Sequence, residues 1–271
     1  MSGFASVTAM LGLVRSIGGN FLGFLESAGE IVFLFTDTMR CLTRYRWRFK
    51  HIIAQIHRVG VSSIVVIVTT GSFTGAVFAT QMQYQFGPLG MNSAVAPVVA
   101  VSMFRELGPV LAALMVAGRV GSSLAAELAT MKITEQLDAL RALAVYPTEY
   151  LIAPRVIALL ISMPVLVSLT IGCGIMAGYY VAVPVLEVDG TYYWANTLKF
   201  TSLSDVLTGL IKGIIFGFII ALISCHKGLS TSAGAEGVGR ATTEAVVNSS
   251  MVVLISNFFI SFLLNLILPA D

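Results

Sequence analysis

The sequence predicts an all-α integral membrane protein: an N-terminal amphipathic helix at the membrane interface, then five transmembrane helices. Of its 271 residues, 56% are hydrophobic and only 11% are charged, whereas about a quarter of the residues of a soluble domain are charged. Five apolar stretches are each about as long as the roughly 20 residues that cross a bilayer as a helix. Because these stretches are too long and too apolar for barrel strands, helices are the expected spanning elements.

The expected spans lie at residues 59–80, 94–117, 152–183, 206–225 and 245–268. The third is long enough to tilt or to include an interfacial turn near Pro164. Thirteen lysines and arginines lie in the N-terminal segment and in the two loops that share its side, whereas Lys199 alone lies in the two opposite loops. The positive-inside rule therefore places the N-terminus in the cytoplasm and the C-terminus outside. No removable signal peptide is apparent.

Residues 1–58 form a separate N-terminal segment in this interpretation, and residues 59–271 form one transmembrane domain. Apolar residues recur at helical spacing near the start, which predicts an amphipathic helix that lies in the interface. They are Val7, Leu11, Val14, Ile17, Phe21 and Leu25. Basic and aromatic residues then alternate over 44–50. Beside a span, this pattern favours an anchor to anionic lipid headgroups over the alternative, a nucleic-acid site.

The second span carries two adjacent charges, Arg105 and Glu106. An ionised side chain near the bilayer centre costs roughly 3 kcal/mol on insertion scales, and such residues commonly mark transport pathways. A functional pair is therefore favoured over a purely structural ion pair. Adjacent helical residues point about 100° apart, so we expect only one of them to face any given spot. Lys212, near the outer end of the fourth span, is a further candidate, although snorkelling to the interface is the favoured explanation for it.

The longest cytoplasmic loop is expected at residues 118–155. Within it, Ile133, Leu137, Leu140 and Ala144 form an apolar stripe at helical spacing, and Pro147 ends the helix. The opposite face is of mixed charge, and this favours a protein partner over lipid. Glu135, Asp138 and Arg141 form that face.

Several chemistries are excluded by the absence of their motifs. Cys41, Cys173 and Cys225 are scattered and form no CxxC pair, so neither a disulfide framework nor a metal site is expected. The chain has no GxxxxGK[ST] phosphate loop, and the glycines at 234–239 follow a span rather than a strand. Small residues four apart, as at Gly71 and Gly75, predict close helix packing, either within the chain or between subunits.

Five motifs resemble those of the MlaE permease family. They are FRELGP at 104–109, AGRVGS at 117–122, AELATMKITEQLDAL at 126–140, APR at 153–155 and GAEGVGRAT at 234–242. The resemblance covers about 59–268, nearly the whole transmembrane region, whereas the N-terminal segment is similar only in character. The outer loop at 187–200 is less typical of the family.

This resemblance implies a non-catalytic membrane subunit of an ABC transporter in the bacterial inner membrane. Such subunits form homodimers, bind two ATPase subunits on the cytoplasmic side and a ring of MCE-domain protein on the periplasmic side, and move phospholipids between the membrane and that ring. This transport contributes to outer-membrane lipid asymmetry. The chain itself would hold no cofactor, because the ATPase partner uses the ATP. The alternatives are an ATP-independent lipid or small-solute transporter and, less favoured, a membrane-embedded lipid enzyme.

The resemblance also assigns expected roles to particular residues. Arg105, Glu106 and Leu107 match the charged segment beside the family's lipid cavity. The segment at about 118–150 contains the counterpart of the coupling helix that docks on the ATPase. The expected coupling residues are Glu127, Lys132, Glu135, Asp138 and Arg141.

Overall fold

A computed structural model describes residues 29–41, 49–185, 188–232 and 234–267, and every regular element in these ranges is a helix. Five helical segments are long and apolar enough to cross a membrane, which confirms the predicted fold class. They are Lys50–Leu89, Asn92–Ile133, Thr148–Ala182, Leu203–Leu229 and Ala235–Ile267. The predicted amphipathic stretch at 7–25 and most of the basic and aromatic patch lie outside the described residues.

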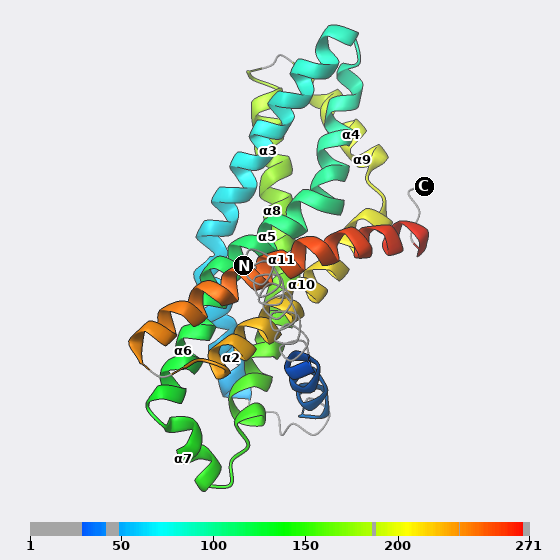
Figure 1. Cartoon of the computed structure of the whole chain (residues 1–271). Coiled ribbons are helices and arrows are strands. Elements are labelled where there is room, and N and C mark those ends of the chain that lie inside the picture. The colour runs from blue at the N-terminus through cyan, green and yellow to red at the C-terminus, as the bar shows by residue number, and fades with distance from the viewer. Residues whose placement is uncertain (1–28, 42–48, 186–187, 233, 268–271) are drawn as a thin grey trace, which may run out of the picture.

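The first span is a bent helical segment. It consists of α2 (Phe49–Val59), the short turn η1 (Val61–Ser63), α3 (Ile64–Phe86) and the turn η2 (Gly87–Leu89). The bend lies at Gly60, where a side chain would crowd Ser162 of the third span. Figure 1 shows α3 running the length of the upper half of the molecule beside α8.

The second span is longer than predicted. It runs without a break through α4 (Asn92–Ser102), the π-helical turn η3 (Met103–Leu107), α5 (Gly108–Val116), a second π-helical turn η4 (Ala117–Gly121) and α6 (Ser122–Ile133). Residues 118–133 of the predicted loop are therefore not a loop but a continuation of the helix of the second span. The apolar run ends near the charged Arg119, but within the protein Arg119 bonds to Ser63, and Glu127 further along the helix pairs with two arginines.

The predicted amphipathic helix over 133–144 is also divided. Glu135 has a left-handed backbone, with φ of 58°, and separates α6 from the short α7 (Gln136–Ala142). The apolar stripe therefore does not lie on one helix, because Ile133 belongs to α6 and Ala144 to the turn that follows α7. The turn η5 (Thr148–Ile152) then leads into α8 (Ala153–Ala182), and α7 lies at one tip of the molecule (Figure 1).

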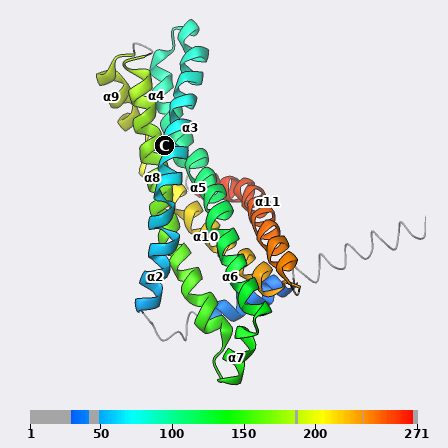
Figure 2. The same cartoon turned by 90° about the vertical axis from the view of Figure 1, so that its left-hand side faces the viewer.

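The segment between the third and fourth spans contains a helix that was not predicted, α9 (Gly190–Phe200). The Asp189 side chain begins it by accepting a hydrogen bond from the backbone of Tyr192. Two long helices complete the fold, α10 (Leu203–Leu229) and α11 (Ala235–Ile267). Figure 2 shows α9 and α4 at the end of the molecule opposite α7.

The core is centred on α8, which packs against both α3 and α10. Glycines permit these close approaches, because a Cβ on Gly75 would clash with the backbone of Gly174, and a Cβ on Gly71 with that of Thr170. The small-residue spacing at these positions therefore serves packing within the chain. Much of α11, by contrast, presents large apolar side chains outward, including Phe258, Phe259 and Phe262, as expected of a helix that faces lipid or another subunit.

Candidate functional site

A network of charged and polar side chains joins the second, fourth and fifth spans. Arg105 and Glu106 lie on the π-helical turn η3, Asp205 and Lys212 on α10, and a row of polar residues on α11. A residue inside an apolar span must find its polar partners within the protein. The network meets that requirement by pairing each acid with a base from another helix.

Lys212 is the most deeply buried member. Its ammonium group lies 2.9 Å from a Glu106 carboxylate oxygen, and it donates to the Arg105 carbonyl at 2.6 Å and to the Ser261 hydroxyl at 2.7 Å. The side chain is fully buried, so the prediction that Lys212 snorkels to the interface is wrong. With three oxygen partners inside the bundle, the ammonium group has no need to reach the headgroup region.

Arg105 forms the second ion pair, with Asp205. Its guanidinium also donates to the side-chain oxygen of Asn265 at 2.7 Å. Asp205 in turn accepts from the Ser202 backbone at 2.9 Å and so helps to cap α10. Asp205 was expected in the outer loop, but it is buried in the first turn of α10.

Arg105 and Glu106 take separate partners, yet both side chains reach toward α10 and α11. Glu106 accepts a hydrogen bond from Asn257 at 2.9 Å, four residues before Ser261 and eight before Asn265. The expectation that only one of the pair faces a given spot therefore holds for individual partners but not for the site as a whole. Leu107, the third residue of the expected cavity, is half-buried and packs against the core.

Four members of the network were not predicted: Asp205, Asn257, Ser261 and Asn265. The last three recur every four residues, which places them on one face of a helix. This polar face in an otherwise apolar span can be recognised in the sequence. It lies where the charges of the second and fourth spans find partners.

A second cluster of charge lies nearer α7. Glu127 on α6 pairs with Arg58 on α2 and, at 3.1 Å, with Arg155 on α8. The structure thus places Glu127 between three helices, apart from the expected coupling residues on and beside α7. Among those, Asp138 and Arg141 form an exposed ion pair at 2.9 Å, and Lys132 and Glu135 are also exposed.

The α7 tip also exposes apolar side chains. Leu143 and Tyr146 are 74% and 76% exposed, and they lie next to the Asp138–Arg141 pair in sequence. An exposed surface that combines charged and apolar groups in this way is suited to a protein partner. Among the described residues, no group of three His, Cys, Asp or Glu side chains could hold a metal ion.

Comparison with known proteins gives consistent matches over most of the chain. The Permease MlaE family model matches residues 52–263. A "Probable ABC transporter permease protein" of Rickettsia felis is 45% identical over 93% of this chain and 97% of its own length. The "Intermembrane phospholipid transport system permease protein MlaE" of Haemophilus influenzae is 35% identical over the same shares of the two chains. A probable ABC transporter permease of Synechocystis is 41% identical over 79% of this chain and 82% of its own length.

Proposed function

The chain belongs to the MlaE family of ABC transporter permeases, and from this we propose that it moves phospholipids between the bacterial inner membrane and a periplasmic MCE-domain protein. As a permease it is a non-catalytic, multi-pass membrane subunit, and ATP is used by an ATPase partner. In the proposed assembly two copies form a homodimer, two ATPase subunits bind at the α7 tip, and an MCE ring covers the opposite end. The N-terminus is cytoplasmic and the C-terminus periplasmic.

One observation carries the substrate proposal. The network of Arg105, Glu106, Asp205 and Lys212 lies within apolar spans, and Glu106 remains 44% exposed while its partner is fully buried. A charged group that is accessible beside an apolar surface suits an amphiphile, with a polar headgroup at the charge and acyl chains along the helix. The outward phenylalanines of α11 provide such a surface.

The continuous second span supports coupling to ATP. A single helical run connects η3, which holds Arg105 and Glu106, with α6, and the left-handed residue Glu135 then joins α6 to α7. In the proposed mechanism, closure of the ATPase pair displaces α7, and the helical run transmits this displacement to the network. Lipid is then moved because its affinity differs between the two states. In an ATP-independent transporter the affinity for lipid would not depend on the nucleotide state of an ATPase.

Photocrosslinking of lipid in the assembled transporter tests the proposal. A photoreactive residue at position 107, beside Glu106, is expected to form a lipid adduct that decreases when the ATPase is trapped with ATP and vanadate. The control position is Val65, which is 74% exposed on α3 and is expected to label bulk lipid equally in both states. Absence of an adduct at 107, or an adduct that ignores the nucleotide state, would contradict the proposal.

A further inference from the structure

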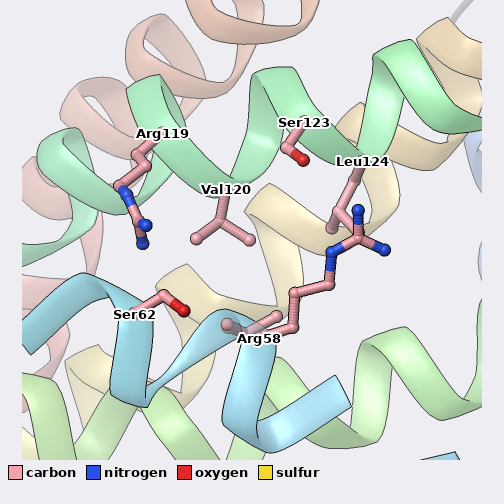
Figure 3. Close-up of a pocket in the computed structure, with 7 residues that line it drawn as sticks. Arg58, Ser62, Arg119, Val120, Ser123 and Leu124 are labelled. Carbon is pink, nitrogen blue, oxygen red and sulfur yellow. The ribbon is translucent and has the colours of Figure 1, made fainter. Parts of the chain in front are cut away.

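A polar hollow lies between the first and second spans, apart from the charged network. Its volume is about 410 Å³, within the range of small-ligand sites. Four polar residues line it: Arg58, Ser62, Arg119 and Ser123. Figure 3 shows that they come from two walls, Arg58 and Ser62 from the α2–η1 segment and Arg119 and Ser123 from η4 and α6. The apolar part of the lining consists of Val59, Val120 and Leu124.

The hollow and its surroundings carry an excess of positive charge. The Arg58 guanidinium pairs with Glu127, a carboxylate that it shares with Arg155. Arg119 has no carboxylate partner among the described residues; its guanidinium donates to the Ser63 hydroxyl at 2.9 Å. Glu127 thus pairs with two of the three guanidinium groups and Arg119 adds an unmatched positive charge, so the balance at this place favours an anion.

The donors come from both walls of the hollow, and the two guanidinium groups lie on either side of Val120 (Figure 3). In Figure 3 the Arg119 side chain extends toward the α2–η1 wall, and Arg58 extends from that wall toward α6. Guanidinium groups present paired N–H donors that match phosphate oxygens. The hydroxyls of Ser62 and Ser123 are both on exposed residues of the lining and can donate to the remaining oxygens.

We infer that this hollow, here called the Arg58–Arg119 pocket, binds the phosphate of an anionic phospholipid headgroup from the cytoplasmic leaflet. The inference rests on the orientation given under the proposed function, which places the start of the first span at the cytoplasmic interface. Basic pockets between transmembrane helices on that side are suited to anionic headgroups. Val59, Val120 and Leu124 supply an apolar edge along which the glycerol end of the lipid can lie.

Binding of a short-chain lipid to the full-length chain in its detergent-solubilised complex tests the inference without ATP or transport. Dihexanoyl phosphatidylglycerol is titrated into the wild type and into Arg119→Gln, which removes a guanidinium that donates to the Ser63 hydroxyl. We expect binding at least about tenfold weaker in the variant, because a charge-assisted hydrogen bond is lost. The matched control is Arg240→Gln, an exposed arginine at the start of α11, with wild-type binding expected.

Two further measurements separate the outcomes. The double variant Ser62→Ala, Ser123→Ala keeps both charges and is expected to bind several-fold more weakly, which covers the case in which Arg119→Gln does not fold. Inorganic phosphate is titrated in parallel and is expected to compete poorly.

Equal binding of the lipid by wild type and both pocket variants would overturn the pocket. Binding of inorganic phosphate as tight as that of the lipid, with the same dependence on Arg119, would overturn the lipid as its source. Because no ATP is present, these results do not depend on the crosslinking at position 107, so either proposal can fail alone.

Discussion

The ammonium group of Lys212 lies 2.9 Å from the Glu106 carboxylate, yet the lysine side chain is fully buried and the glutamate side chain is 44% exposed. The pair is therefore asymmetric. Without Glu106, Lys212 retains only neutral partners, the Arg105 carbonyl and the Ser261 hydroxyl. Without Lys212, Glu106 still has Asn257 and its exposed face. The lysine depends on the pair more than the glutamate does.

This asymmetry predicts that Glu106→Gln destabilises the protein more than Lys212→Met. Breaking a buried pair so that one charge is left uncompensated costs roughly 3–5 kcal/mol, and we expect Glu106→Gln to approach the lower figure. The double variant should recover most of the loss, because no unpaired charge remains. Chemical unfolding in detergent, followed by tryptophan fluorescence, measures all three. Equal losses in both single variants, without recovery in the double variant, would show that the pair is not coupled.

A second prediction concerns the α7 tip. Asp138→Lys and, separately, Glu135→Lys should reduce stimulated ATPase activity and ATPase co-purification severalfold, because both reverse a charge on the proposed docking surface. Stability should change little, since the exposed pair of Asp138 and Arg141 contributes about 0.5 kcal/mol at most. The matched control is Glu236→Lys, an acidic residue in the first turn of α11. Normal ATPase binding and activity in both tip variants would remove the coupling role from α7.

A third prediction uses two glycines that differ only in their surroundings. Gly75→Ala places a methyl group against the backbone of Gly174, whereas Gly172 on α8 has no atom within 4 Å of the added Cβ. Gly75→Ala should therefore force α3 from α8 and cost roughly 1–3 kcal/mol or more. Gly172→Ala should be neutral or slightly stabilising, because alanine favours the helix by about 1 kcal/mol. Melting temperatures of the two variants decide the matter, and similar values would show that the helices do not meet at Gly75.

The number and type of the spans followed from hydropathy alone, since a helix in lipid must be long and apolar. The sequence was less informative about where the second span ends. Arg119 and Glu127 are charged, and charge near a span end usually indicates the aqueous phase. Here the charges are matched by Ser63, Arg58 and Arg155 from other helices. Only tertiary packing supplies those partners, so a one-dimensional pattern could not show that the helix continues past these charges.

Only part of the candidate site could be predicted from the sequence, for the same reason. Arg105 and Glu106 are conspicuous because they are adjacent and lie within an apolar run. Lys212 was assigned to the interface, since a lysine near the end of a span usually snorkels. Lys212 is buried instead because the polar face of α11 supplies a partner for it. The contact of α11 with α10 depends on long-range packing. Asn257, Ser261 and Asn265 recur at helical spacing in the sequence. Amides and hydroxyls cost less in a membrane than charges do, so their presence in a span is weaker evidence of a functional site.

A fourth prediction separates Glu127 from the coupling residues. Arg155 is only 4% exposed, and Glu127 is its one ion-pair partner within the described part of the chain. Glu127→Gln should therefore lower stability by roughly 3 kcal/mol, because it leaves a buried guanidinium uncompensated. Lys132→Gln, on the exposed end of the same helix, should leave stability within about 0.5 kcal/mol of the wild type. A loss of ATPase coupling in Glu127→Gln with unchanged stability would instead support the role that the family resemblance implied.

A fifth prediction follows from Tyr193 on α9. Burial raises the pKa of this phenol to about 12, against about 10 in an unfolded chain, and its hydroxyl has no hydrogen-bond partner among the described residues. Below pH 10 the phenol is neutral in both states and does not make stability depend on pH. As the pH rises from 10 toward 12, the unfolded chain ionises first, so stability falls.

Tyr193→Phe should abolish that part of the alkaline loss. At pH 8 the variant should be as stable as the wild type or up to about 1 kcal/mol more stable, because an unsatisfied buried hydroxyl is removed. Melting temperatures at pH 8 and pH 10.5 measure the effect, with Tyr192→Phe, an exposed tyrosine of the same helix, as the control. The gap between Tyr193→Phe and the wild type should widen at the higher pH. A gap that stays constant, or that Tyr192→Phe reproduces, would mean that the Tyr193 hydroxyl is not held in a dry environment, and α9 would then pack more loosely on α8 than its contacts with Tyr179 indicate.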